Sequence, residues 1–258
     1  MEKITSKSNT IIKDTNRLFT SSKARNENHL FALEGARLCF DVLNSVYEAD
    51  TLLYTEDIYS RYPDEIDALA KKSDRVYVIT NDVAQKLTQT KSAQGVFLTV
   101  KAKDEQKNFN CGKIIALDNV QDPANVGAII RSAEALGIDG IVAYNCCDVF
   151  NPKTLRASMG SILRMSICVT DDLEQTLSQM KSSGFKVYST VPSTQATKIT
   201  DVDSVTIPCA LSATRQTAWR KISRRLVMTL SQSPCLAGQK ALTQALRHQL
   251  QCGRCFDE

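Results

Sequence analysis

LDNVQDPANVGAIIRSAEALG, residues 117–137, carries a strand end through an Asp-Pro turn into an amphipathic helix. Gly137 is placed to stop that helix, and Gly127 lets another backbone approach it closely. If the helix begins near Asn125, Arg131 lies almost two turns in and close to the same face. An arginine fork can hold a phosphate and a ribose hydroxyl. The spacing alone favours a plainer interpretation, a capping asparagine followed by a surface arginine.

Strands and helices alternate around and beyond this stretch. Strands are expected at 113–120, 138–144, 167–170 and 185–191, helices at 125–137 and 172–184, and a helical or loop segment at 151–165. This succession predicts a parallel sheet with helices on both faces. Ligands of such sheets bind at the carboxyl ends of the strands.

A second α/β series precedes the first. Strands are expected at 29–35, 51–55, 75–80 and 95–100, and helices at 11–26, 36–46, 65–73 and 82–90. Together they predict a compact domain that ends near Val100. We therefore expect one domain over 1–103, a charged linker over 104–111 and a second domain over 112–258.

The composition is that of a globular chain. Its 258 residues are 43% apolar, no window approaches 18 uncharged apolar residues, and the first residues lack the apolar core of a secretion signal. Nine cysteines without framework spacing fit a reducing compartment. We expect a cytoplasmic protein with no membrane span.

Positive charge is unevenly distributed. Residues 212–258 hold eight Lys and Arg against two acids, so this tail carries a charge of +6. The whole chain has a net charge of +4, so the charge of the remaining residues is about −2. Within residues 11–26, four basic side chains follow a loosely helical spacing. They form either a solvated helix face or contacts to RNA phosphates, at Lys13, Arg17, Lys23 and Arg25.

Three segments resemble the SpoU/TrmH branch of the SPOUT methyltransferases. DNVQDPANVGAIIRSAEALG follows that family's first motif, D-P-x-N-x-G-x-I-x-R-x-A-x-A-x-G, at nearly every specified position. NPKTLRASMGSILRM, residues 151–165, resembles its S-P-K-x-x-R-A-S-x-G-A-x-x-R segment. ARNENHLFALEGARLCFDVL, residues 24–43, resembles the family's substrate-binding domain. The resemblance covers roughly residues 10–211.

The resemblance implies a fold. It predicts an N-terminal α/β domain like ribosomal protein L30e and a C-terminal Rossmann-like domain threaded into a trefoil knot, an exception to the usual absence of knots. Members of the family are homodimers with the site near the interface. The knot holds S-adenosyl-L-methionine in a bent form, and no metal is needed.

The resemblance also implies a reaction, methyl transfer to a ribose 2′-hydroxyl of rRNA or tRNA. Arg131 matches the arginine that helps to activate the hydroxyl, and Asn125 matches the asparagine beside it. The acceptor itself distinguishes RNA from DNA. The expected cofactor-binding residues are Thr190, Val191, Pro208 and Leu211, and Arg156 joins the expected RNA contacts.

The chain departs from the family after Pro208. Two further motifs, G-N-E-x-x-G and I-P-M-x-G-x-x-E-S-L-N, line the cofactor site in the family, and neither is present. The sequence that stands in their place has poor amphipathicity and loses an apolar last helix. Buried apolar side chains contribute roughly 1.5–3 kcal/mol each, against domain stabilities of about 5–15 kcal/mol. We expect the second domain to be marginally stable, its knot disrupted and its cofactor binding weak, while the first domain folds regardless.

A shifted reading frame explains the departure. We took the third base of each codon with the first two bases of the next, from Ser212 onward. Suitable synonymous codons then spell GNEANGVAEDIS and, further on, TIPMSGRAESLNAGVAASIAMWEMLR, followed by a stop codon at the junction of Asp257 and Glu258. Both missing motifs return in order. We infer the loss of one base near Leu211 or Ser212.

Two other functions remain open at this point. An RNA-binding protein without catalysis would keep the first domain and Arg131 but lack the cofactor pocket, and RNA binding without methyl transfer would identify it. A nucleotide-dependent oxidoreductase would need G-x-G-x-x-G after a strand, which the sequence lacks.

The frame hypothesis predicts the nucleotide sequence. Reading the gene across the codons for Leu211 and Ser212 should reveal a second frame that encodes both missing motifs and ends at the Asp257/Glu258 junction. Codons whose third bases cannot spell G-N-E would refute the hypothesis. Independent resequencing then separates a true mutation from a reading error.

Overall fold

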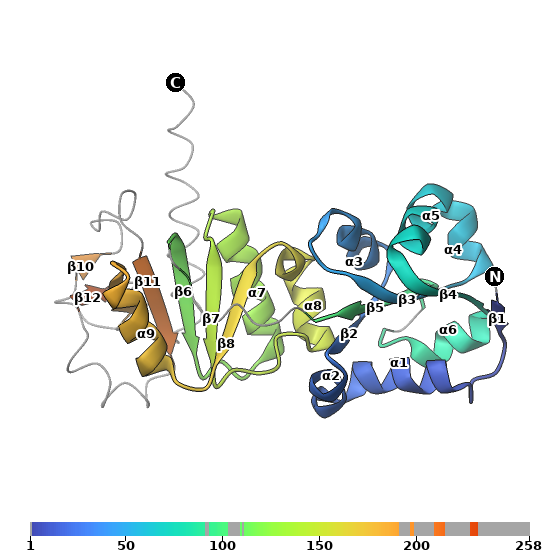
Figure 1. Ribbon diagram of the computed structural model, residues 1–258, viewed down its shortest axis with the longest axis horizontal. Helices are drawn as coiled ribbons and strands as arrows, with labels where there is room; N and C mark the ends of the chain where they lie inside the picture. Colours follow the sequence, from blue (N-terminus) through green and yellow to red (C-terminus); the bar gives the residue numbers. More distant parts are fainter. Residues whose placement is uncertain are drawn as a thin grey trace, which may run out of the picture. The chain divides into compact units, whose positions relative to one another are not determined.

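The computed structural model describes residues 2–90, 93–102, 109, 111–190, 197–198, 209–214 and 228–231. The chain forms two compact units, drawn in Figure 1. The N-terminal unit comprises Met1–Asp104 with Phe150–Arg164, and the C-terminal unit comprises Glu105–Val149 with Met165–Glu258. In the part of the chain that the structure describes, no helix is long and apolar enough to cross a membrane.

The N-terminal unit is built on a five-stranded mixed sheet in the order β1-β4-β3-β5-β2. Its strands are β1 Glu2–Ile4, β2 Leu30–Glu34, β3 Ala49–Tyr54, β4 Ser73–Ile79 and β5 Val96–Lys101. β5 runs antiparallel to both β2 and β3, whereas β4 runs parallel to β1 and β3. Apolar side chains on either face of such a sheet are buried by helices packed against it.

Helices cover both faces of this sheet. They are α1 Thr10–Thr20, α2 Ser22–Asn28, α3 Ala36–Asp41, α4 Glu56–Arg61, α5 Pro63–Lys72, α6 Asn81–Leu87 and α8 Pro152–Ser158. α1 and α6 lie on one side, and α3, α4 and α5 lie on the other (Figure 1). Ile12 of α1 and Leu87 of α6 pack in one cluster with Leu53 and Phe97 of the sheet, all almost completely buried.

The helical structure expected over 11–26 is confirmed but forms two helices, because the chain turns between α1 and α2. Ser21 has extended backbone angles, and its side chain accepts a hydrogen bond from the Ala24 backbone N–H as the cap of α2. Serine is one of the residues favoured at such cap positions. The helix expected over 36–46 is also shorter, ending at Asp41 and continuing as a 3₁₀ turn over Val42–Asn44. The sequence reading missed β1 and α4.

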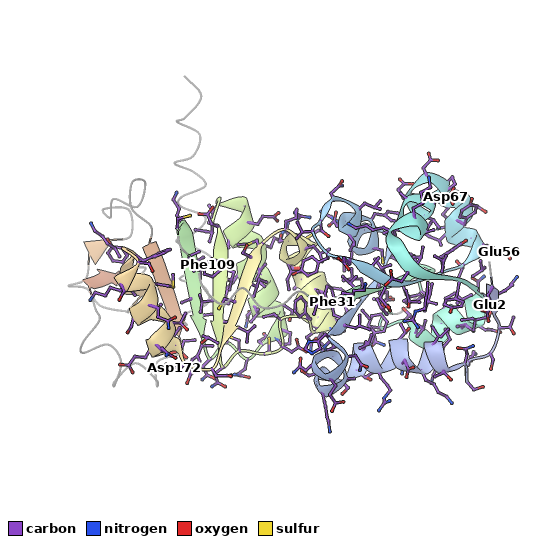
Figure 2. The ribbon with its side chains drawn as sticks, in the orientation of Figure 1. Glu2, Phe31, Glu56, Asp67, Phe109 and Asp172 are labelled. Atoms are coloured by element: carbon purple, nitrogen blue, oxygen red, sulfur yellow. The ribbon has the colours of Figure 1, made fainter. Side chains whose placement is uncertain are left out.

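The segment Phe150–Arg164 packs within the N-terminal unit, although the sequence predicts that the second domain begins at residue 112. Phe150 stacks on Phe31 of β2 with ring centroids 4.4 Å apart, and Figure 2 labels Phe31. Arg164 lies 3.3 Å from the carboxylate of Asp41. The helical segment expected at 151–165 is α8 with a 3₁₀ turn at Ser161–Leu163. The domain limits given above stay a prediction.

The C-terminal unit contains, among its described residues, a seven-stranded sheet in the order β10-β12-β9-β11-β6-β7-β8. Its strands are β6 Lys113–Asp118, β7 Gly140–Tyr144, β8 Ser166–Thr170, β9 Lys186–Thr190, β10 Thr197–Lys198, β11 Cys209–Thr214 and β12 Met228–Ser231. Every pairing is parallel, which confirms the predicted sheet. The knot expected of the family involves residues after 190, which lie largely outside the described residues.

Two helices flank the sheet, α7 Pro123–Ala135 and α9 Leu173–Ser182. The connection through α7 moves one way along the sheet, from β6 to β7, and the connection through α9 moves the other way, from β8 to β9. Right-handed crossovers in opposite directions place their helices on opposite faces. Leu177 and Met180 of α9 pack against Ala116 and Val142 of the sheet.

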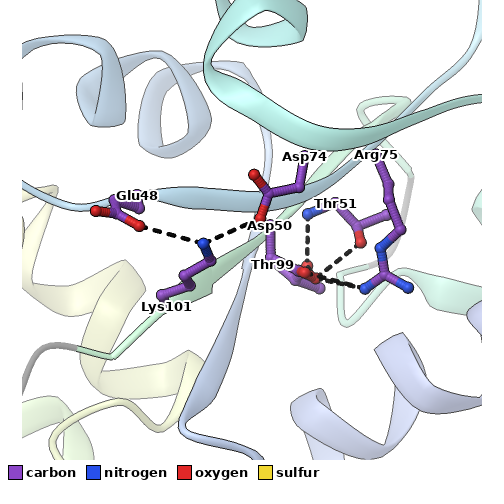
Figure 3. Close-up of polar contacts among 7 residues, drawn as sticks. All are labelled: Glu48, Asp50, Thr51, Asp74, Arg75, Thr99 and Lys101. Atoms are coloured by element: carbon purple, nitrogen blue, oxygen red, sulfur yellow. Dashed lines mark hydrogen bonds and ion pairs between the residues drawn. The ribbon is translucent and has the colours of Figure 1, made fainter.

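A partly buried carboxylate, Asp50 of β3, ties three strands of the N-terminal sheet together, because its partners lie in β3, β4 and β5 (Figure 3). Asp50 accepts hydrogen bonds from the hydroxyls of Thr99 at 2.7 Å and Thr51 at 2.8 Å, and from the guanidinium of Arg75 at 2.9 Å. Burial alone raises the pKa of Asp50, but these hydrogen bonds and the charge of Arg75 outweigh it and hold that pKa below its ordinary value.

We expect this carboxylate to make the N-terminal unit sensitive to acid. Because the pKa of Asp50 is lower in the folded chain, its stabilisation is complete above the ordinary aspartate pKa and is lost as the pH falls through the folded value. Asp50→Asn should lower the free energy of unfolding near neutral pH and flatten its pH dependence. Urea unfolding followed by circular dichroism from about pH 3 to pH 7 measures both.

Asp14→Asn serves as the matched control, because Asp14 is exposed on α1. It should keep the pH dependence of the unaltered chain. Parallel pH profiles for the unaltered chain and Asp50→Asn would contradict this account.

Candidate active site

The carboxyl ends of β6 and β7 lie next to each other, with Asp118 paired to Tyr144 in the parallel ladder. Asn119 and Asn145 follow these two residues, and both have left-handed backbone angles, with φ of 58° and 48°. Asparagine tolerates that region better than most side chains. The backbone N–H of Asn119 donates to the Tyr144 carbonyl at 2.9 Å, so the pairing continues into the loop.

Asp122 starts the helix that carries the predicted catalytic side chains. Its Oδ1 accepts from the Ala124 backbone N–H at 3.0 Å, and its Oδ2 accepts from Asn125 Nδ2 at 2.8 Å. Pro123 stands at the first helical position, where its missing N–H costs nothing. α7 ends before Gly137, whose φ is 66°, as the sequence predicts.

The expected position of Asn125 needs correction. α7 begins at Pro123, so Asn125 lies in its first turn and does not begin the helix. A regular helix turns about 100° per residue, so side chains six residues apart point about 120° away from each other. Asn125 and Arg131 therefore do not share one face of the helix. Their side chains leave the helix in clearly different directions.

Arg131 is exposed on α7, two turns from the cap. Its side chain has no hydrogen bond or ion pair with another described residue. Its guanidinium is always charged and offers a planar set of donors. An exposed cation with no partner in the described part of the chain is suited to bind an anionic ligand.

The predicted cofactor-binding residues are only partly described. Thr190 is the last residue of β9. Leu211 lies in β11, paired with Tyr188 of β9 on one side and Ile115 of β6 on the other. The carboxyl ends of three parallel strands thus meet at one edge of the sheet. Val191 and Pro208 lie outside the described residues.

The predicted RNA contacts divide into exposed and buried side chains. Lys13 and Arg17 of α1 and Lys23 of α2 are exposed, and Arg156 of α8 is half-buried. Arg25 is only 5% exposed, and its guanidinium donates to the Leu18 carbonyl at 2.5 Å. The expectation for Arg25 was therefore wrong: its side chain completes the turn between α1 and α2 and does not face a ligand.

Sequence reasoning missed the polar side chains between the strand ends and α7. Gln121 lies between Asn119 and Asn145 and donates hydrogen bonds to both. An asparagine directly after each of two neighbouring strands was the available signal.

Burial raises the pKa of the nearby Cys146 thiol, which therefore stays protonated near neutral pH.

Cavities and metal-binding groups do not point to another centre. A cavity of about 520 Å³ lies along α9, beside Phe109, Gln175 and Met180, and does not include Arg131. Within the described ranges, no group of three His, Cys, Asp or Glu side chains could hold a metal ion. The expectation that the site needs no metal stays a prediction.

Comparisons with protein families match both parts of the chain. Residues 112–218 match the SpoU rRNA Methylase family, and residues 9–98 match the MRM3-like substrate binding domain. The 23S rRNA (guanosine(2553)-2′-O)-methyltransferase RlmP of Bacillus subtilis is 31% identical over 191 residues, which cover 74% of this chain and 73% of that protein.

Solved structures share the fold at lower identity. An rRNA methyltransferase from Sinorhizobium meliloti is 24% identical, with a TM-score of 0.84 over 97% of this chain and 98% of its own. The SpoU methyltransferase AviRb from Streptomyces viridochromogenes, in complex with AdoMet, is 20% identical, with a TM-score of 0.78 over 96% and 99%. These likenesses confirm the predicted α/β fold, and the two matched family regions identify its parts as a substrate-binding domain and a methylase domain. With its two matched regions and its relative in Bacillus subtilis, the chain belongs to the SpoU rRNA methylase family.

Proposed function

We propose that this chain transfers a methyl group from S-adenosyl-L-methionine to a ribose 2′-hydroxyl of rRNA or tRNA. The observation that carries the proposal is Arg131, an exposed guanidinium without a partner among the described residues. It lies two turns into α7, the helix that starts from the Asp-Pro turn at the carboxyl edge of a parallel sheet. Membership of the family and the relative in Bacillus subtilis support this reaction.

The chemistry places simple demands on the protein. Methyl transfer to oxygen is a direct displacement that requires alignment of donor and acceptor. A ribose hydroxyl is a poor nucleophile at neutral pH, so its oxygen must be stabilised as it loses its proton. The fixed positive charge of Arg131 favours that developing negative charge and can hold the adjacent phosphate. Asn125 donates to Asp122 through Nδ2, which leaves its Oδ1 to accept a hydrogen bond from the ribose.

The described part of the sheet fits the methyl donor. Thr190 and Leu211 belong to neighbouring parallel strands, and Thr214 of β11 pairs with Asp118 of β6. These strands end at one edge, where α/β sheets bind their ligands. When bound there, the sulfonium would supply an electrophilic methyl group. The backbone groups and loops that follow these strands would hold it, together with Val191, the residue after β9. Pro208 directly precedes β11, so its contact to the cofactor stays a separate prediction.

RNA provides the remaining contacts. The exposed cations Lys13, Arg17 and Lys23, with Arg156, would contact phosphates and orient the substrate. The resemblance to the family supports a cytoplasmic homodimer, and both remain part of the proposal. The rRNA methyltransferase among the relatives favours rRNA as the first substrate to test.

A second candidate function is RNA binding without catalysis. The specific observation is that the motifs G-N-E-x-x-G and I-P-M-x-G-x-x-E-S-L-N are absent from residues 212–258. The match to the SpoU rRNA Methylase family ends at residue 218, shortly after Leu211, where we place the frame shift. This chain would then bind RNA with its N-terminal unit, and only the frame-restored chain would transfer methyl groups.

Substitution of Arg131 tests the proposed reaction. Arg131→Ala should lower the rate of methyl transfer from labelled S-adenosyl-L-methionine to rRNA or tRNA by about 100-fold or more, the usual contribution of a positioned catalytic group. Arg131→Lys should recover only part of the rate, because lysine keeps the charge and loses the planar fork. Both this chain and its frame-restored version are assayed.

Lys181→Ala on α9 is the matched control, since it removes an exposed cation from the opposite side of the sheet. It should leave the rate unchanged. The proposal fails if the frame-restored chain methylates neither RNA, or if Arg131→Ala keeps the full rate. RNA binding by this chain without methyl transfer would instead support the second candidate.

A further inference from the structure

Three amide side chains form a bridge at the carboxyl edge of the C-terminal sheet. Asn119 Oδ1 accepts hydrogen bonds from Gln121 Nε2 at 3.0 Å and from Asn145 Nδ2 at 3.2 Å. Gln121 Nε2 also donates to the backbone carbonyl of Asn145, at 2.5 Å. We call Asn119, Gln121 and Asn145 the amide bridge. It joins the loop after β6 to the loop after β7.

Backbone contacts fix the two ends of the bridge. Asn119 continues the ladder by donating to the Tyr144 carbonyl, and the Cys147 N–H donates to the Val120 carbonyl at 3.0 Å. Both asparagines hold left-handed backbone angles, which cost energy for any residue but glycine. Backbone hydrogen bonds thus join the two loops, and the Gln121 side chain spans them.

The bridge adjoins the cap of α7 along the chain. Gln121 directly precedes Asp122, whose carboxylate caps the helix and holds Asn125. A change in the backbone at Gln121 would move that carboxylate, and the first turn of α7 would follow. The orientation of the helix sets where Arg131 points, since Arg131 lies two turns further on.

We propose that Gln121 is a positioning residue for the reaction: through the amide bridge it holds the cap of α7, and so the placement of Asn125 and Arg131. This inference rests on the function proposed above. An amide is required at position 121 because both of its donated hydrogens meet oxygen atoms, Asn119 Oδ1 and the Asn145 carbonyl. A carboxylate of the same size would present oxygen to oxygen.

Gln121→Glu in the full chain tests the proposal. Hydrogen exchange of the backbone amides of Ala124, Asn125 and Val126, which all donate to Asp122, should become about tenfold faster. Gln121→Ala should give a smaller change, since it adds no repulsion. Gln175→Glu on α9 is the control, because only the backbone N–H of Gln175 takes part in the hydrogen bond to the Asp172 side chain. It should leave exchange in α7 unchanged.

A second pair of variants separates the amide from the backbone conformation. Asn119→Gly keeps the left-handed angle and removes the side chain, whereas Asn119→Ala removes the side chain and disfavours the angle. The proposal expects faster exchange at the start of α7 in both variants. If only Asn119→Ala speeds exchange, the backbone conformation rather than the bridge holds the loop, and the proposal is overturned.

Kinetic measurements complete the test, on this chain or on its frame-restored version, whichever transfers methyl groups. Gln121→Glu should lower kcat about tenfold or more while the KM for RNA and the Kd for S-adenosyl-L-methionine change much less. An unchanged kcat overturns the positioning role. If no chain transfers methyl groups, the proposed function fails, and hydrogen exchange still decides whether Gln121 holds the cap. Unchanged exchange in Gln121→Glu overturns the inference whatever the activity.

Discussion

Two hydrogen bonds accepted by the carboxylate of Asp122 determine how the functional part of this molecule is arranged. One satisfies the Ala124 N–H at the start of α7, and the other restrains the side chain of Asn125. Without a cap, the first N–H groups of a helix lack partners, and its start frays. Because β6 enters the turn and α7 leaves it, this one carboxylate joins the rigid sheet to the helix that presents Arg131.

Local signals in the sequence predicted an element correctly wherever the element's own residues determine its structure. The Asp-Pro turn and Gly137 located α7 to within two residues, and the apolar runs located β6, β7, β8 and β9 but not β10, β11 and β12. Features that depend on tertiary contacts were missed. Arg25 looks like any basic side chain of a polar helix until the turn at Ser21 brings the Leu18 carbonyl to it.

The candidate site was predicted in part for the same reason. A motif names Asn125 and Arg131, but both lie inside α7, where a spacing of six residues turns their side chains about 120° apart. Gln121 was missed because its importance arises from the pairing of β6 with β7, which brings Asn145 within reach. The predicted cofactor side chains at Val191 and Pro208 lie outside the described residues, so their roles stay proposals.

The segment Phe150–Arg164 makes the N-terminal unit discontinuous along the chain. Its ring stack on Phe31 and its ion pair with Asp41 mean that a gene fragment ending at the linker would encode an incomplete fold. Recombination that exchanged only residues before the linker would bring together Phe31 and Phe150 from different ancestors. Chimeras made from this chain should therefore take both segments from one parent, so that the two rings of that aromatic contact stay matched.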